Sequence, residues 1–209
     1  MAPTAPRKRA RTSSCPSSRS SDTVFLSGGE SCPTKLAALW RAGELNDVVV
    51  TVDGRSFAAD KKVLASGSDY FEKLFKSECR DRDAPVIRDE LLASAFEPLL
   101  AFLYDGSVAV AEELIMPLLH AADYLGVEPL KQAAAAALAE RLVTSNALAV
   151  WTLADDLSLP SLVEAAKDKA LRGFEELGES LVEAPLTQVE ALVADERLTA
   201  QSEDAVFSA

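Results

Sequence analysis

The sequence predicts an α+β fold up to about residue 142, followed by a segment that is helical throughout. The clearest observation is a pair of strand-like runs, 48–52 and 55–59, which Asp53-Gly54 separates. Asp-Gly at this place favours a type I′ hairpin, because both central residues of that turn have positive φ. Apolar residues then recur at helical spacing, and from residue 143 onward this is the periodicity that dominates.

Two short helices are expected directly after the hairpin, and Ser68 is placed to cap the second of them. Their apolar residues are Val63, Leu64, Tyr70, Phe71, Leu74 and Phe75. Another helix is expected ahead of the hairpin, at 34–42, because Gly43 is a suitable residue to end it. One face of that helix carries the apolar residues Leu36, Leu39 and Trp40. The pattern leaves open whether this face packs inside the chain or against another molecule.

The N-terminal residues are rich in Ser, Pro, Arg and Thr, so they cannot bury enough apolar surface to offset the entropy lost on ordering. We therefore expect a disordered tail over 1–33, within which 23–26 has the ambiguous pattern of a short strand. The basic segment 6–11 is similar to a short nuclear-import signal, and a solvated basic tail is the alternative.

The stretch 76–85 is charged and is expected to be a loop, followed by a short strand at Val86-Ile87. Ser94 and Glu97 form a capping-box pattern, which predicts that a helix begins there and ends at Gly106. Ser161 and Glu164 repeat the capping-box pattern further along the chain. The other expected elements are a strand at 108–110 and helices at 112–125, 129–142, 146–157, 161–174 and 185–193.

The residue types argue against an enzyme, a metal site and a cofactor site. Three widely spaced cysteines without a CxxC motif predict free thiols, and His120 is the single histidine, which we expect to be partly buried on a helix. Adjacent acids such as Asp155-Asp156 diverge by about 100° on a helix, so they do not form a catalytic carboxylate pair.

Charge and hydropathy limit the classes of partner that this chain is expected to bind. The first 20 residues carry five basic side chains and no acidic one, while the whole chain has a net charge of −12, so the remainder has a net charge of −17. Such an acidic body repels the phosphate backbone, and no direct nucleic-acid binding is expected. The longest apolar runs fall far short of the ~20 residues that span a bilayer. We expect no membrane partner and a cytoplasmic location, with nuclear entry if the basic segment acts as an import signal.

Residues in the hairpin region resemble the opening of a BTB/POZ domain, an intracellular protein-interaction module. The matching residues are Asp47-Val48, Phe57, Ala59, Lys61, Val63-Leu64-Ala65 and Ser68-Asp69-Tyr70-Phe71. Asp60 departs from the family pattern, which has His at this place. A second match runs from Phe96 to Gly106, at the spacing that the family requires. The resemblance implies a BTB/POZ fold over 34–142, with a short mixed sheet flanked by a helical cluster.

The segment 143–209 resembles the start of a BACK domain, the helical extension that follows the BTB domain in kelch-type adaptors. Its matching residues include Asn146-Ala147-Leu148 and the terminal Ser202-Glu203-Asp204-Ala205-Val206-Phe207. We expect a BACK-like segment that is incomplete, so that any substrate-binding part of a longer relative is absent from this chain.

The resemblance implies an interaction protein rather than an enzyme. Such a protein dimerises through its BTB domain and links a protein substrate, unknown here, to a cullin-RING ubiquitin ligase. The alternative is a self-associating scaffold or transcriptional cofactor that does not bind a cullin. The residues implied for the dimer interface are Leu36, Leu39, Trp40, Asp47 and Asp60. The residues implied for the cullin contact are Phe75, Cys79, Asp81 and Tyr104.

Two departures from the family pattern have expected consequences. Cys79 and Asp81 are smaller than the hydrophobic residue and the glutamate that the family usually has, so a weakened cullin contact is expected. The resemblance also implies that Asp47 and Asp60 lie close together near the dimer cleft. Their carboxylates then repel each other, unless a lysine at 61 or 62 neutralises one of them or the pKa of one of them rises.

Overall fold

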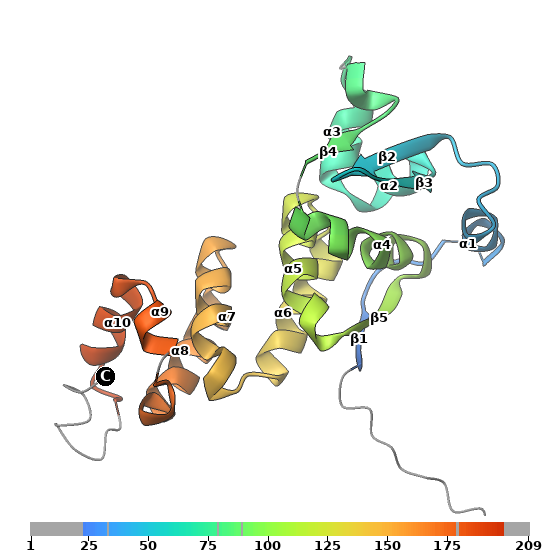
Figure 1. The fold of residues 1–209 in the computed structure, drawn as a ribbon. Helices are drawn as coiled ribbons and strands as arrows, with labels where there is room; N and C mark the ends of the chain where they lie inside the picture. Colours follow the sequence, from blue (N-terminus) through green and yellow to red (C-terminus); the bar gives the residue numbers. More distant parts are fainter. Residues whose placement is uncertain (1–22, 33, 79, 89, 179, 199–209) are drawn as a thin grey trace, which may run out of the picture.

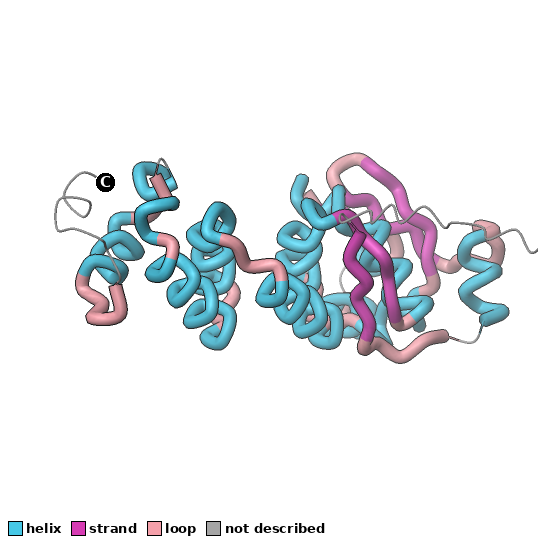
Figure 2. Tube along the Cα trace, turned by 90° about the horizontal axis from the view of Figure 1, so that it is seen from below, coloured by secondary structure: helices cyan, strands magenta, loops and turns pink. Residues whose placement is uncertain are grey.

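The computed structural model describes residues 23–32, 34–78, 80–88, 90–178 and 180–198. The strands gather at one end of the molecule, and the helices that follow residue 143 extend away from them (Figure 1). A view turned by 90° shows the same division between a mixed end and an all-helical end (Figure 2). The predicted α+β region followed by an all-helical segment is therefore confirmed.

The chain enters the fold through β1 (Thr23–Ser27), which pairs antiparallel with β5 (Ser107–Ala111). Val24 and Leu26 are buried while Phe25 between them is 67% exposed, which is the alternation of a strand with one covered face. The ambiguous pattern of this segment thus resolves to a strand.

The predicted disordered tail, 1–33, is wrong in its last part, because β1 lies within that range. The hydrogen-bond partners of β1 lie on a strand far along the chain, and a local pattern does not reveal them. Residues 1–22, including the basic segment 6–11, lie outside the described residues.

A second sheet has the strand order β3-β2-β4 and is mixed, as predicted. The hairpin strands β2 (Val48–Val52) and β3 (Arg55–Ala59) are antiparallel, and the short β4 (Val86–Ile87) runs parallel to β2. Asp53 and Gly54 have φ of 44° and 79°, so the predicted turn with positive φ at both central residues is confirmed. Alternate residues of β2 are buried against the helices.

Helices cover the buried sides of the two sheets. Up to residue 140 they are α1 (Thr34–Arg41), α2 (Lys61–Gly67), α3 (Asp69–Lys76), α4 (Glu90–Asp105), α5 (Ile115–Tyr124) and α6 (Glu128–Glu140). Ser68 caps α3 as predicted, because its hydroxyl accepts a hydrogen bond from the Phe71 amide at 3.3 Å. The largest fully buried side chains are aromatic, and they come mainly from α3 and α4. They include Tyr104, Phe71 and Phe96.

The two predicted capping boxes are wrong, because both helices begin earlier. α4 begins at Glu90, and Leu92 and Ala93 ahead of Ser94 are buried in the core, so packing extends the helix toward its N-terminus. α8 (Pro160–Arg172) begins one residue before Ser161. Proline suits the first turn of a helix, since its fixed φ is helical and its missing N–H has no intrahelical partner there.

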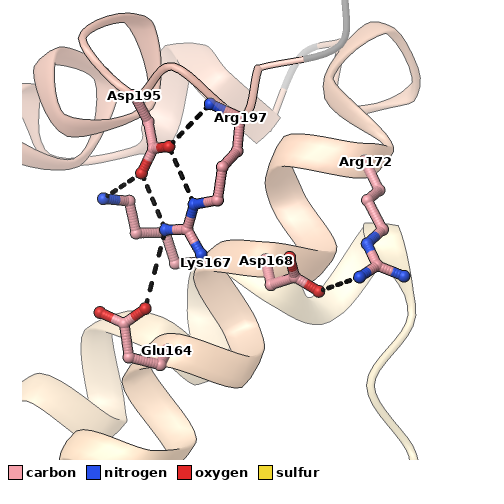
Figure 3. A network of polar contacts seen from close by, with 6 residues as sticks. All are labelled: Glu164, Lys167, Asp168, Arg172, Asp195 and Arg197. Carbon is pink, nitrogen blue, oxygen red and sulfur yellow. Dashed lines mark hydrogen bonds and ion pairs between the residues drawn. The ribbon is translucent and has the colours of Figure 1, made fainter.

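The helical segment continues with α7 (Thr144–Asp156), α8, α9 (Ser180–Glu183) and α10 (Leu186–Val193). A polar network then joins α8 to the chain that follows α10 (Figure 3). Asp195 accepts hydrogen bonds from Arg197 and lies 2.7 Å from the Lys167 ammonium. These bonds hold the pKa of Asp195 far below its usual range, with Arg197 as the largest cause.

Candidate protein-interaction surfaces

The junction between β3 and α2 holds both aspartates that the sequence assigns to the dimer cleft. The Asp47 amide donates to the Ala59 carbonyl at 3.2 Å, and the Asp47 carboxylate accepts the Lys61 amide at 2.7 Å. Asp47 therefore satisfies one of the free N–H groups at the start of α2. Asp60, the residue just before α2, has a different donor.

Asp60 is bonded twice to Tyr104, which comes from the last turn of α4. The Asp60 amide donates to the tyrosine oxygen at 3.0 Å, and the tyrosine hydroxyl donates to the Asp60 carboxylate at 2.7 Å. Tyr104 is fully buried. Burial, and next the hydrogen bond to Asp60, raise the pKa of Tyr104 well above its ordinary value. Each aspartate carboxylate therefore accepts a hydrogen bond from its own donor, the Lys61 amide for Asp47 and the Tyr104 hydroxyl for Asp60.

Trp40 covers Tyr104 from the side of α1. The two rings are stacked, with centroids 4.3 Å apart and planes 4° apart, and the Trp40 indole donates to the Ala58 carbonyl at 3.1 Å. Arg41 adds an ion pair to Asp105. These contacts fasten α1 to its own chain.

This packing corrects the assignment of Tyr104 to the cullin contact. A side chain that is fully buried beneath Trp40 and bonded to Asp60 offers no surface to a partner. Trp40 itself is half-buried and keeps one exposed side.

An apolar residue that the sequence analysis missed lies between α1 and β2. Leu45 is 82% exposed and has φ of 61°, an uncommon conformation for a residue with a side chain. The next residue, Asn46, has both polar side-chain atoms buried, and the described residues offer neither of them a hydrogen-bond partner. The sequence signal that could have identified Leu45 is that it is a large apolar residue in an otherwise polar connection. Leu36 and Leu39, on α1, are partly buried.

A hollow of about 520 Å³ lies beside α1. It is lined by residues of α1, the connection to β2, β3 and α4, among them Trp40, Gly43, Asn46, Phe57 and Leu100. Its lining mixes apolar residues with polar and charged ones, which are Arg41, Asn46, Ser56 and Glu97.

A metal role would need a group of suitable side chains, and a membrane role would need a helix that could cross a bilayer. The described residues contain no group of three His, Cys, Asp or Glu side chains that could hold a metal ion. His120 is half-buried on α5, as predicted. Burial, then Asp60 and Asp105, raise the pKa of the Cys32 thiol, which makes it a poorer nucleophile. No helix in the described ranges is both long and apolar enough to cross a bilayer.

Residues 36–142 match the BTB/POZ domain, which is half of the chain or more. The chain belongs to the BTB/POZ family. The matched range begins two residues after the predicted start of this domain and ends at the predicted residue, 142.

Relatives of this BTB protein extend the match past its BTB domain. It is 35% identical over 156 residues to human Kelch-like protein 21, covering 74% of this chain and 26% of that protein. It is 30% identical over 160 residues to Kelch-like protein 38 of Danio rerio, covering 75% and 27%. Human Kelch-like protein 24 is 30% identical over 166 residues, covering 78% and 28%. The chain thus spans about a quarter of the length of these relatives, and its helices after residue 143 form a BACK-like segment.

The BTB domain exposes a second surface on α3 and the turn after it. Phe75 is half-buried with its ring stacked on Phe71, 5.7 Å between centroids. The predicted loop 76–85 contains a short 3₁₀ turn, η1 (Arg80–Arg82), within which Asp81 is exposed. Cys79 lies outside the described residues.

Aromatic surface continues from α3 to α5 of this BTB domain. Tyr124 is 48% exposed, and its ring lies 5.8 Å from that of Tyr70. We refer to the exposed parts of Tyr70, Phe75, Asp81 and Tyr124 as the α3–α5 surface. The sequence did not identify Tyr124 as an exposed residue. It lies at the end of an apolar helix pattern, where a tyrosine can equally be buried.

Proposed function

We propose that this BTB protein is a homodimeric adaptor that links a protein substrate to a cullin-RING ubiquitin ligase. The observation that carries the proposal is the similarity to Kelch-like proteins through the BTB domain and into the helices beyond it. By the family resemblance, BTB–BACK proteins dimerise and bridge cullins to substrates. The substrate-recognition part of such a protein is not among the segments matched here.

The α3–α5 surface is the proposed cullin-binding surface. It combines aromatic side chains that can be buried in a complex with an exposed carboxylate at Asp81. Aromatic residues are enriched in the centres of protein interfaces, because they bury a large area at a low cost in side-chain entropy. Cys79 belongs to the same segment by sequence, and its role is carried over from the family pattern alone.

Titration calorimetry with a purified cullin N-terminal domain tests this proposal. We expect the wild type to bind and Asp81→Lys to lose most of the affinity. Asp155→Lys is the matched control, because it makes the same charge change on the exposed part of α7. If the wild type and the Asp155→Lys variant both fail to bind, the adaptor role falls. A self-associating scaffold is then the function to consider.

The proposed dimer interface is the exposed side of α1 together with Leu45. Leu45 is 82% exposed in the single chain, next to α1. A second copy of the chain that covers this face can bury the Leu45 side chain. Leu36, Leu39 and Trp40 contribute their exposed parts to the same face.

A further inference from the structure

Lys61, the first residue of α2, contacts three segments that are separate in the sequence. Its amide donates to Asp47 ahead of β2, as described above. Its ammonium group lies 2.7 Å from an Asp83 carboxylate oxygen and 5.7 Å from the centroid of the Phe75 ring. A cation over an aromatic face is attracted by the negative face of the ring. One side chain therefore joins α2, α3 and the segment after η1.

Other hydrogen bonds attach the two ends of the segment between α3 and β4. At its start, Arg82 donates to the Ser77 carbonyl at 3.4 Å. At its end, the Thr51 amide donates to the Pro85 carbonyl at 2.8 Å. Asp83 lies between these points with its side chain 69% exposed, and its shorter ion pair is the one with Lys61.

The charges around Asp83 favour its ion pair with Lys61 at neutral pH. The hydrogen bond and the charge of Lys61 lower the pKa of Asp83 from its ordinary value. Arg82 also faces Asp83, at 3.9 Å, and adds to the same effect. Lys62, the next residue, is exposed, and no ion pair joins it to another of the described residues.

We propose that Lys61 is a positioning residue for the α3–α5 surface. By holding Asp83 and contacting one side of the Phe75 ring, it keeps the 80–84 segment folded in the unbound chain with Asp81 already presented. Binding then costs less ordering entropy than binding by a free loop. This inference rests on the proposed cullin binding.

The test compares Lys61→Met with Lys62→Met, which removes the same charge from the adjacent position of α2. Two measurements are made on the full chain: affinity for the cullin N-terminal domain, and amide hydrogen exchange of residues 80–84. We expect Lys61→Met to weaken binding by about 3- to 10-fold and to speed exchange in this segment. Lys62→Met should behave as the wild type in both measurements.

Asp83→Asn is the second variant, because a side chain so exposed can be changed without affecting the core. It should reproduce the faster exchange and part of the lost affinity. The inference is overturned if the wild type binds and both Lys61→Met and Asp83→Asn bind equally well. Failure of the wild type itself to bind instead overturns the proposed cullin adaptor, and the role of Lys61 in binding falls with it.

Discussion

Asp60 and Tyr104 exchange two hydrogen bonds, one through the Asp60 amide at 3.0 Å and one through its carboxylate at 2.7 Å. The pair joins the start of α2 to the last turn of α4, and the Trp40 ring of α1 stacks on the Tyr104 ring. Asp60 stands where the family pattern has His. The carboxylate is therefore a structural acceptor for a buried hydroxyl in this chain, which leads to the first two predictions.

Removing either side of this pair should destabilise the BTB domain. Tyr104→Phe removes the donor to the carboxylate and the acceptor of the Asp60 amide, and we expect a loss of about 1–2 kcal/mol in the free energy of unfolding. Asp60→Ala should cost a similar amount, and the double variant less than the sum. Urea unfolding measures these values. Asp60→Asn is the control, since it keeps an acceptor, and additive losses would contradict the coupling.

The same tyrosine should make the protein sensitive to alkali. A folded-state pKa raised above the unfolded value means that the stabilisation is complete below about pH 10, the unfolded value, and is lost as the pH rises further. The difference in unfolding free energy between wild type and Tyr104→Phe should therefore shrink above about pH 10, at up to about 1.4 kcal/mol per pH unit. A constant difference from pH 8 to 11 would contradict this assignment.

Leu45 should be required for self-association. We expect the wild type to be a dimer at micromolar concentration and Leu45→Asp to be a monomer, since burying one leucine is worth about 1.5–3 kcal/mol. Leu186→Asp is the matched control, because this leucine of α10 is also highly exposed and lies away from α1. Light scattering decides the question, and a monomeric wild type refutes the proposed dimer.

Cullin affinity should be limited by Cys79 and Asp81. Relative to the larger hydrophobic residue usual in the family, Cys79 lacks about two methylenes, or roughly 1.6 kcal/mol at ~0.8 kcal/mol each. We expect the double variant Cys79→Met and Asp81→Glu to bind a cullin N-terminal domain about tenfold more tightly than the wild type. Calorimetry on both proteins measures the gain. Equal affinities would mean that this segment is not the limiting contact.

Acid should loosen the end of the helical segment first. Because the folded-state pKa of Asp195 is depressed, its contribution is complete above about pH 4 and is lost as the pH falls below that value. Asp195→Asn should therefore speed amide exchange in α10 at neutral pH. It should also remove most of the loss of protection that the wild-type α10 shows between pH 5 and pH 3. Asp156→Asn, on an exposed part of α7, is the control.

Much of the fold follows from local chemistry that the sequence displays. Asp53-Gly54 specifies a turn with two positive φ angles, alternation in β2 marks its buried face, and Ser68 is a cap whose partner lies three residues away. Each of these signals involves residues that are close in the chain. Together with the longer family matches, they were sufficient to predict the BTB domain and the helical segment after it.

Only the tertiary structure decided how the candidate surfaces are made. The strand character of β1 depends on β5, the early start of α4 depends on the burial of Leu92, and Tyr104 became a buried core residue because Trp40 stacks on it. The contact between Lys61 and Asp83 likewise joins residues that share no local pattern. The physical reason is the same in each case. A local pattern states which side chains are apolar or can accept a hydrogen bond, whereas the partner that covers or bonds them comes from distant parts of the chain.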